Sequence, residues 1–405
     1  MATQPHLIIV GGGAAGFFAA LTAKSANNEL QVTILEATSQ VLRKVAISGG
    51  GRCNVTHACF EPKELVKFYP RGNRELLGAF HKFQPRDTVE WFESRGVKLK
   101  TEADGRMFPV SDSSQSIIDC LTREAEKLGV SVLLNANLKA VEKQQDGRFA
   151  LELANGEFMT TDRLLLACGG TRSLKGAQLA ESLGHSSLAP VPSLFSFRIK
   201  DERLKKLSGV AKQQAAVSSG DLKQQGALLI THEGLSGPAI LKLSAWGARI
   251  FAEQNYDFTI SVDWTAGARV REQFTTSRQN FGKRQLRNDP QFEIPQRLWE
   301  RLLENAEIPE GRRWLELRKS EEETLVRTLT ASCFQVSGKS LNKDEFVTCG
   351  GIPTREVDFR SMESKLCPGL YFAGEILDID GVTGGFNFQN AWTTAYLAGT
   401  AMANC

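Results

Sequence analysis

The feature that most restricts the fold of this chain is a glycine loop between an apolar run and a helix near its start. Leu7-Ile8-Ile9-Val10 predicts a buried strand, and Gly11-Gly12-Gly13-Ala14-Ala15-Gly16 follows at once. An apolar helix is predicted over about 17–23, and a second β-run at 32–35 ends on Glu36. The order strand, G-x-G-x-x-G, helix, strand and acid is typical of a dinucleotide-binding unit.

Each part of this unit has a physical role. Gly11 permits the tight turn, Gly13 lets backbone N–H groups approach a pyrophosphate, and Gly16 lets the helix pack closely on the strand. The pyrophosphate then lies at the positive end of a helix. Glu36 is placed to accept hydrogen bonds from ribose hydroxyls. The loop alone leaves NAD and FAD as alternatives.

A second glycine-rich segment begins six residues after Glu36. It runs Leu42-Arg43-Lys44-Val45-Ala46-Ile47-Ser48-Gly49-Gly50-Gly51-Arg52-Cys53-Asn54. Arg43 and Lys44 are expected to reach the ribose and the pyrophosphate. Three consecutive glycines cost conformational entropy, and close approach of the backbone to a flat ring would justify them. A flexible loop is the alternative interpretation.

A third segment near the end of the chain favours FAD. Tyr371-Phe372-Ala373-Gly374-Glu375 predicts a strand that ends on a ribitol contact, and Gly384-Gly385-Phe386-Asn387 opens a helix. The start of that helix would stabilise negative charge on the flavin N1–C2=O2 edge. NAD domains have no use for this second site. The residues predicted to contact FAD are Gly11, Gly13, Ala14, Ala15, Gly16, Glu36, Arg43, Lys44, Ser48, Gly49, Gly50, Arg52, Cys53, Asn54, Leu138, Ala167, Gly169, Gly374, Glu375, Gly384, Gly385, Phe386 and Asn387.

These and other segments occur in an order that resembles the BaiN/RdsA family of NAD(P)/FAD-dependent oxidoreductases, nearly end to end. The matching segments are 44–56, 105–109, 231–238, 347–351, 362–365 and 374–387. The resemblance implies an FAD domain with an inserted β-barrel and a helical subdomain. It also implies flavin reductase chemistry, since members are associated with dihydrouridine formation in ribosomal RNA, reduction of conjugated dehydro-steroid acids and aminoacetone oxidation. A shorter stretch after Thr171 departs from the family pattern.

The predicted fold class is α/β, a Rossmann-like FAD-binding domain interrupted by an insertion. Strands and helices alternate before 190–192, with helices at about 74–95 and 114–128 and an accessory β-meander within 130–153. Short strands follow over 193–265 and helical spacing over 266–330. From Asp344 onward the pattern of buried strand and helix typical of a Rossmann fold resumes. The predicted domains are 1–192 with 345–405 for FAD, 193–265 with about 331–344 for the barrel, and 266–330 for the helical subdomain.

Reduction of an activated C=C bond needs a hydride and a proton donor within hydrogen-bond reach. Cys53 is one candidate, because Arg52 beside it would favour a thiolate; a packed thiol is the alternative. His232 is the second candidate, with a hydrogen-bonded turn histidine as the alternative. Cys349 is expected to pack, and His57 would qualify if its loop folds inward.

The expected activity is NAD(P)H-driven reduction of a conjugated C=C bond, with a uracil in ribosomal RNA as the preferred substrate. A second nucleotide fingerprint is absent, so NADH or NADPH is expected to dock transiently. Residues 266–320 hold 12 lysines and arginines against 8 acids, and 269–287 hold six of those basic residues. This segment is either an RNA-contacting surface or a solvated helical face. The alternatives are a reductase or oxidase of a small metabolite and a non-catalytic flavin redox sensor.

Composition excludes some classes of protein. A net charge of +3 does not demand a polyanionic partner, and no apolar run approaches a membrane span. The eight cysteines lack metal-ligand spacing, so no metal site is expected. The first strand begins at residue 7, which leaves no room for a signal peptide, and a cytoplasmic location is expected. The oligomeric state is left open.

Overall fold

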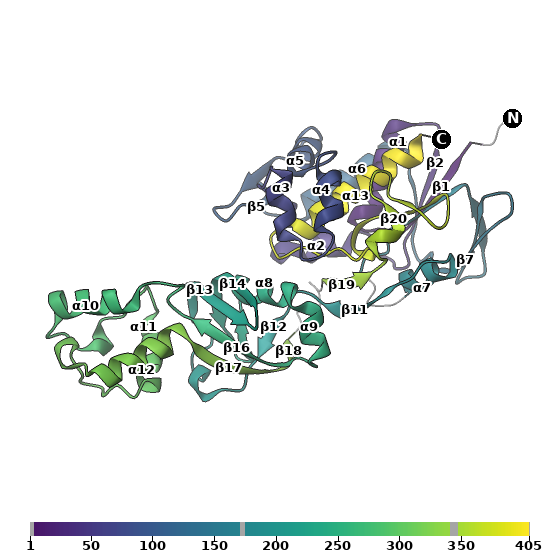
Figure 1. Ribbon diagram of the computed structural model, residues 1–405. Helices are drawn as coiled ribbons and strands as arrows, with labels where there is room; N and C mark the ends of the chain where they lie inside the picture. The colour runs from purple at the N-terminus through teal and green to yellow at the C-terminus, as the bar shows by residue number, and fades with distance from the viewer. Residues whose placement is uncertain (1–3, 171–174, 341–346, 405) are drawn as a thin grey trace. The chain divides into compact units, whose positions relative to one another are not determined.

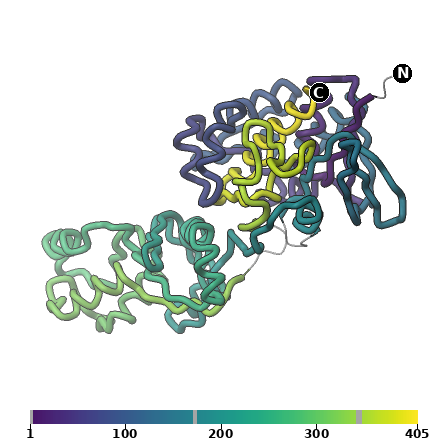
Figure 2. The backbone as a smooth tube through the Cα atoms, turned by 45° about the vertical axis from the view of Figure 1, so that its right-hand side comes forward, coloured from purple at the N-terminus to yellow at the C-terminus, as the bar shows by residue number. Residues whose placement is uncertain are grey.

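The computed structural model describes residues 4–170, 175–340 and 347–404. The chain divides into two compact units, Met1–Pro192 with Lys343–Cys405 and Ser193–Asn342. Figure 2 shows the first unit built from both ends of the chain, since its purple and yellow segments lie together. The domain boundary predicted at 344/345 and the shortened stretch that starts at Thr171 lie outside the described residues.

The first unit is organised around a seven-stranded sheet in the order β20-β21-β22-β10-β1-β2-β6. Strands β22, β10, β1, β2 and β6 are parallel, whereas β20 and β21 pair antiparallel at one edge. The central strand β1 is apolar because neighbouring strands and covering helices bury it. The bounds are β1 His6–Val10, β2 Gln31–Leu35, β6 Ser131–Leu133, β10 Arg163–Leu166, β20 Val357–Asp358, β21 Glu363–Ser364 and β22 Leu370–Phe372.

Two helices from opposite ends of the chain, α1 and α13, lie side by side in this unit (Figure 1). A Cβ added at Gly399 of α13 would lie 2.6 Å from the backbone oxygen of Ala19 in α1, so only glycine permits this approach. The helices are α1 Ala14–Ala26, α2 Arg43–Gly51, α3 Pro62–Leu65, α4 Asn73–Phe80, α5 Pro85–Glu93, α6 Gln115–Lys127, α7 Lys175–Ser182 and α13 Phe386–Ala403.

The single helix predicted over 74–95 is wrong, because the chain forms two helices there. Helix α4 ends at Phe80, and α5 begins at Pro85. Proline lacks an N–H group and disfavours helical geometry in the residue before it, so it starts a helix more readily than it continues one. Gln84 and Asp87 form a capping box at the new helix start.

Three small antiparallel sheets complete the first unit. Strands β7, β8 and β9 form an antiparallel meander, and β3, β5 and β4 form a second sheet. The meander predicted within 130–153 is correct for β7 and β8 but wrong for its first strand, because the run near 131–133 forms β6 at the edge of the main sheet. Strands β11 and β19, which flank the insertion, pair with each other. Their bounds are β3 Thr56–His57, β4 Leu99–Thr101, β5 Arg106–Pro109, β7 Leu138–Lys143, β8 Phe149–Leu153, β9 Phe158–Thr161, β11 Leu188–Pro192 and β19 Thr348–Gly351.

The second unit contains a seven-stranded sheet in the order β17-β16-β13-β14-β15-β12-β18. Its two end strands are consecutive in the chain, with Gly338 between them, so the sheet curves round into a barrel in which β17 continues into β18. The strands are β12 Ser196–Arg198, β13 Ala211–Ser219, β14 Leu222–Ile230, β15 Gly234–Ser236, β16 Asp257–Asp263, β17 Ser332–Ser337 and β18 Lys339–Ser340.

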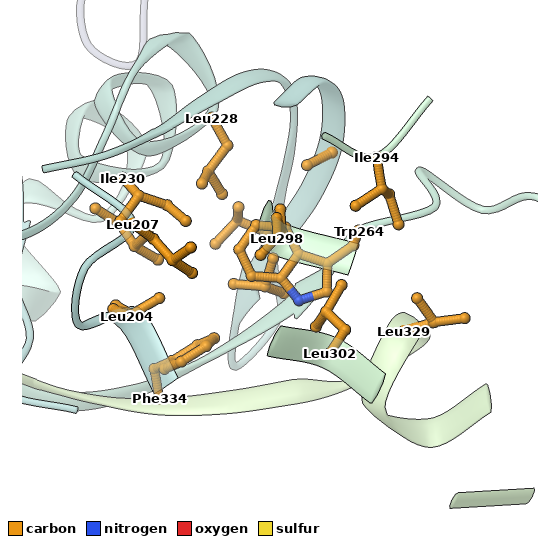
Figure 3. Packing of buried hydrophobic residues seen from close by; sticks show 14 of the residues in the cluster. Leu204, Leu207, Leu228, Ile230, Trp264, Ile294, Leu298, Leu302, Leu329 and Phe334 are labelled. Atoms are coloured by element: carbon orange, nitrogen blue, oxygen red, sulfur yellow. The ribbon is translucent and has the colours of Figure 1, made fainter. Parts of the chain in front are cut away.

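Helices of the insertion share one hydrophobic core with this barrel. Figure 3 shows Leu298 and Leu302 of α11 beside Trp264, with barrel residues such as Ile230 in the same cluster. The helices are α8 Pro238–Trp246, α9 Ala248–Glu253, α10 Val270–Phe281, α11 Gln296–Asn305 and α12 Lys319–Thr330. Among the described residues of both units, no helix is long and apolar enough to cross a bilayer.

Candidate functional site

In the glycine loop after β1, two glycines are needed because other backbone atoms lie close to them, and a third borders open space. Gly11 has φ +114°, and a Cβ there would lie 2.3 Å from the backbone oxygen of Ala167. A Cβ at Gly16 would lie 1.9 Å from the Gly11 oxygen, whereas one at Gly13 would meet nothing within 4 Å. The first two glycines are therefore required by the protein itself, and Gly13 borders open space.

Helix α1 begins at this opening. Its N-cap residue Gly13 offers no side-chain cap, and Phe17 is the first residue whose N–H bonds back to the Gly13 oxygen, at 3.0 Å. The N–H groups of Ala14, Ala15 and Gly16 have no acceptor within the helix. Uncapped amides beside open space fit a pyrophosphate, so the residues present suit a dinucleotide.

Glu36, the acid at the end of β2, is held in place by neighbouring donors. Its Oε2 accepts the Gly12 N–H at 2.9 Å, and its Oε1 accepts the Thr38 N–H at 2.9 Å and hydroxyl at 2.8 Å. The Ala136 N–H bonds to the Glu36 backbone oxygen at 2.9 Å, which brings the start of β7, with Leu138, beside this acid. The carboxylate is thus fixed next to the glycine loop.

The Gly49–Gly51 turn is a kink at the end of α2. Ser48, Gly49 and Gly50 depart from helical geometry, and Gly51 has φ +83°. A Cβ at Gly50 or Gly51 would meet nothing within 4 Å. The Ser114 N–H bonds to the Gly51 oxygen at 2.9 Å, which anchors the turn. The turn is therefore held by hydrogen bonds, and Gly50 and Gly51 border open space, whereas a Cβ at Gly49 would lie 2.9 Å from the Phe108 ring.

Lys44 of α2 and Glu375, which follows β22, form an ion pair within this region. The Lys44 Nζ lies 2.5 Å from Glu375 Oε2, and Glu375 Oε1 accepts the Thr348 N–H at 2.9 Å. A Cβ at Gly170 would lie 2.7 Å from the same Oε1. Four separate segments of the chain therefore meet at one carboxylate.

The three glycine segments converge on one surface of the first unit. A Cβ at Gly374 would lie 3.0 Å from that of Ala15, which brings the third segment against the first. The Asn54 carboxamide oxygen, turned toward Gly385, accepts its N–H at 3.0 Å, which joins the second segment to the third. The start of α13 is thus fastened beside the Gly49–Gly51 turn.

Asn387 and Phe386 shape the start of α13 with their side chains. The Asn387 carboxamide accepts the Gly381 N–H at 2.8 Å and donates to the Gly381 oxygen at 2.9 Å. The Phe386 ring stacks on Phe68 at 4.4 Å and on His57 at 4.7 Å between centroids. Both side chains are occupied within the protein, so the N–H groups at the helix start are what this segment offers to a cofactor.

The other residues predicted to contact FAD lie at the rims of these segments. Ala167 and Gly169 follow β10, and a Cβ at Gly169 would meet nothing within 4 Å. Arg43 begins α2 and is exposed, and the Ser48 hydroxyl donates to the Val45 oxygen at 3.0 Å. Gly384, with φ +133°, precedes α13.

The expected effect of Arg52 on Cys53 is wrong. The Arg52 guanidinium pairs with Glu102 at 2.6 Å and lies 3.9 Å from the centroid of the Phe108 ring. The Cys53 thiol is buried, and burial raises its pKa to about 12 although a hydrogen bond with Ser48 acts in the other direction. A packed, protonated thiol, the alternative interpretation, fits this geometry.

The remaining proton-donor candidates lie in different surroundings. Cys349 is buried in β19, and His57 stacks on Phe386 with its Nε2 at 3.1 Å from the Asp104 oxygen. His232 belongs to the second unit, where it is exposed in the turn between β14 and β15. It borders a groove of about 660 Å³ that Lys200 and Lys205 also line. Cys53 and His232 thus belong to different units.

Sequence reasoning missed groups that hold the site residues in place. Thr38 fixes Glu36, Thr348 fixes Glu375, and Ser114 fixes the Gly49–Gly51 turn. Thr348 lies in one of the segments shared with the family, so the sequence did contain a signal for it. Ser114 has no local signal, because its role depends on a contact with a distant turn.

The basic segment 269–287 is extensively paired with acids. The arginines at 269, 271, 278, 284 and 287 each lie within ion-pair distance of a carboxylate. For example, Arg284 lies 2.7 Å from Asp289, and Arg287 lies 2.8 Å from Glu310. The segment is therefore a less uniform positive surface than its composition indicated.

The fold and the three convergent glycine segments define an FAD-binding domain of the Rossmann type with a barrel insertion. Residues 5–401 match the family model described as HI0933-like protein Rossmann domain. The chain belongs to this family and is an FAD-dependent oxidoreductase.

Similar proteins cover the whole chain. The ribosomal RNA dihydrouridine synthase of Escherichia coli K12 is 32% identical over 400 residues, 96% of each chain. The 3-dehydro-bile acid delta(4,6)-reductase of Clostridium scindens is 31% identical over 408 residues, 98% of each chain. Among solved structures, the 3-ketosteroid-delta4-(5alpha)-dehydrogenase of Rhodococcus jostii RHA1 has a TM-score of 0.52 at 15% identity, covering 100% of this chain and 99% of that one. This last likeness concerns the fold alone.

Proposed function

We propose that this protein reduces a uracil in ribosomal RNA to dihydrouracil, with NADH or NADPH as the electron donor. The observation that carries the substrate is the 32% identity to a ribosomal RNA dihydrouridine synthase over 96% of both chains. The proposal places the protein in the cytoplasm, where its substrate would be. Lys44 and Glu375 lie in the same region as the starts of helices α1 and α13, which supports the part of the proposal that concerns FAD binding.

The reaction adds two hydrogens across the C5=C6 bond of the base. NAD(P)H is oxidised as it gives up a hydride, C6 gains a hydride, and C5 gains a proton from a donor on the protein. FAD, when bound, supplies the two-electron chemistry between the nicotinamide and the base. The first N–H groups of α13, fastened beside Asn54, favour negative charge on a ring bound against them.

His232 is the proton donor that we favour for this reaction. It is exposed and borders a groove, whereas the Cys53 thiol is buried with a pKa of about 12. An imidazole ring within hydrogen-bond reach of the substrate can carry a proton and transfer it as a general acid. The variants His232→Ala and Cys53→Ala separate these roles, since loss of the donor slows reduction of the substrate but leaves reduction of FAD by NAD(P)H intact.

A small conjugated enone is the second candidate substrate. The observation that favours it is the 31% identity to a bile acid reductase over 98% of both chains. An oxidase of a small amine and a flavin redox sensor without turnover are further alternatives. Each of these alternatives would bind FAD through the same residues, so only identification of the substrate distinguishes them.

The deciding experiment removes the gene and maps dihydrouridine across ribosomal RNA. Loss of one or more dihydrouridines, restored by the wild-type gene, is expected; an unchanged map would overturn the RNA substrate. Anaerobic mixing of the purified holoprotein with NADH or NADPH should bleach the flavin absorbance. Bleaching together with turnover of an unsaturated steroid acid would support the second candidate, and absence of bleaching with both nucleotides would contradict a reductase.

A further inference from the structure

A hollow of about 560 Å³ lies where helix α10 ends in the second unit, and we call it the Phe281 hollow. The Phe281 side chain is 44% exposed and Leu315 is 66% exposed. The residues that line it are Arg278, Gln279, Asn280, Phe281, Gly282, Lys283, Arg284 and Leu315. They include three basic side chains and no acidic one.

The backbone around the hollow is fixed by hydrogen bonds. The Leu315 N–H bonds to the Gly282 oxygen at 3.0 Å, and the Trp314 N–H bonds to the Arg284 oxygen at 3.2 Å. A Cβ at Gly282 would lie 2.5 Å from Leu315 Cγ, so the absence of a side chain there lets the leucine lie against the loop. The two exposed apolar side chains are therefore presented by ordered backbone.

Arg284 is positioned over the exposed aromatic ring. Its Cζ lies 4.5 Å from the Phe281 ring centroid, and its Nη1 donates to Asp289 Oδ1 at 2.7 Å. Asp289 is itself held, because its Oδ2 accepts the Trp314 indole N–H at 2.9 Å and the Gln291 amide at 2.9 Å. A guanidinium fixed beside an exposed phenyl ring makes a platform on which a flat group can stack.

The net positive charge of the hollow comes mainly from one lysine, because each of its two arginines is paired with a carboxylate. Arg278 pairs with Glu322 and Arg284 with Asp289. Among the residues that the structure describes, no ion pair involves Lys283, which is exposed. Its ammonium is thus available to a phosphate at the edge of the stacking platform.

We propose that the Phe281 hollow binds a nucleotide of single-stranded RNA, with the base against Phe281 and Leu315 and the phosphate at Lys283. The inference rests on the RNA substrate proposed above and adds a docking point for it. Single-stranded RNA is held by stacking of bases on aromatic rings together with contacts from basic side chains to phosphates. A protein partner of the hollow would need a segment with acidic and apolar side chains. Binding of such a partner is one of the outcomes that the test distinguishes.

The test measures binding of a fluorescein-labelled, unstructured 12-nucleotide RNA to the FAD-loaded protein by fluorescence anisotropy. Phe281→Ala should weaken binding about tenfold, the loss expected for one stacked base, and Phe281→Trp should retain it. Lys283→Ala should weaken binding and lower the slope of log K against log salt by about 0.7, the value for one phosphate on a single strand.

Two matched variants serve as controls. Phe158 is 77% exposed on β9 and pairs across the meander with Glu152, so Phe158→Ala removes an exposed ring that lies outside the Phe281 hollow. Lys223→Ala removes an exposed lysine of β14. Equal losses in control and hollow variants, unchanged binding in Phe281→Ala and Lys283→Ala, or failure of the wild type to bind the RNA would each overturn the proposal. Unchanged RNA binding combined with loss of a protein partner would assign the hollow to that partner.

Complementation of the deletion strain separates this inference from the proposed function. If the wild-type gene does not alter the dihydrouridine map, the proposed function fails whatever the hollow binds. If wild type and Phe281→Ala restore dihydrouridine equally at low expression, the docking point alone is overturned. Reduced restoration by Phe281→Ala, with normal bleaching of FAD by NAD(P)H, is the expected result.

Discussion

The Lys44 ammonium lies 2.5 Å from Oε2 of Glu375, a residue 331 positions away in the chain. Because the lysine side chain is 55% exposed, the pair contributes at most about 1 kcal/mol to stability. Its position matters more than its strength. It joins the start of α2 to the segment that follows β22, and both segments belong to the predicted cofactor surface.

Lys44→Met should therefore weaken FAD binding while leaving the fold intact. We expect the Kd of the apoprotein for FAD to rise about tenfold, as for loss of one charge-assisted contact, with unfolding free energy changed by less than about 1 kcal/mol. Titration of the apoprotein with FAD measures the first quantity and urea unfolding the second. Lys139→Met is the matched control, because Lys139 lies 2.5 Å from Glu152 and is 61% exposed. An equal rise in Kd in both variants would contradict the assignment.

Alanine at Gly13 and at Gly16 should have opposite consequences. At Gly13 a Cβ enters open space, so Gly13→Ala should fold but lose FAD affinity by about tenfold or more. At Gly16 a Cβ would lie 1.9 Å from the Gly11 oxygen, and the apoprotein should lose about 2–4 kcal/mol of stability.

Thermal unfolding of the apoproteins and FAD titration distinguish these outcomes. Gly78→Ala in α4 is the control, since its Cβ also meets nothing within 4 Å, and it should stabilise the helix by about 0.5–1 kcal/mol. A destabilised Gly13→Ala apoprotein would show that this glycine serves the fold.

Stability should fall as the pH drops below about 6.5, the ordinary pKa of histidine. The buried His185 has Nδ1 at 2.9 Å from Glu356 Oε2 and Nε2 at 2.7 Å from Ser364 Oγ. The Ser364 oxygen already accepts the Cys367 N–H at 2.7 Å, so its hydroxyl donates to Nε2 and the neutral ring is satisfied. Burial lowers the pKa of His185 despite the neighbouring carboxylate.

The sign follows from proton uptake. A histidine whose pKa is lowered by folding binds its proton more readily in the unfolded chain, so its contribution is complete above the unfolded pKa and is lost as pH falls. His185→Gln should flatten urea-unfolding free energy between pH 7.5 and 5, and cost about 1–3 kcal/mol at pH 7.5. Burial lowers the pKa of His6 as well, so the unfolding free energy of His185→Gln should still depend on pH to some extent. His81→Gln, at an exposed histidine, should change neither value; an unaltered slope in His185→Gln would refute the assignment.

The Cys53 thiol should resist alkylation in the native protein. It is buried and its pKa is raised to about 12, so almost no thiolate exists near neutral pH. Iodoacetamide at pH 8 should modify the exposed Cys333 at least about a hundredfold faster, as measured by mass spectrometry of peptides. The exposed thiol serves as the internal control. Rapid modification of Cys53 would restore it as a reactive group.

Local patterns in the sequence predicted the special backbone geometry of the three glycine segments, whereas the FAD contacts assigned to them stay a prediction. Each glycine segment combines special backbone geometry with a neighbouring helix or strand, and these are short-range signals. What the patterns could not supply was the partner of each charged group. Arg52 follows Gly51 and precedes Cys53 in sequence, yet its guanidinium turns to Glu102 and Phe108, because side-chain direction depends on tertiary contacts.

The same limit applies to the insertion. Composition indicated a basic segment over 269–287, but the carboxylates that pair with it include Glu310 and Glu322, which lie outside that segment. Spacing also predicted short strands, whereas closure of the barrel depends on pairing between β12 and β18, which are far apart in sequence. Long-range pairing of this kind leaves no periodic signal.

The pairing of β11 with β19 also bears on how such a chain can change over evolution. Pro192 and Thr348 are Cα partners, so the chain leaves the FAD-binding unit and re-enters it at neighbouring points. The whole insertion between β11 and β19 can therefore be replaced by another domain without altering the register of the parallel sheet. The cofactor half can then be kept while selection remodels the other half for a new substrate.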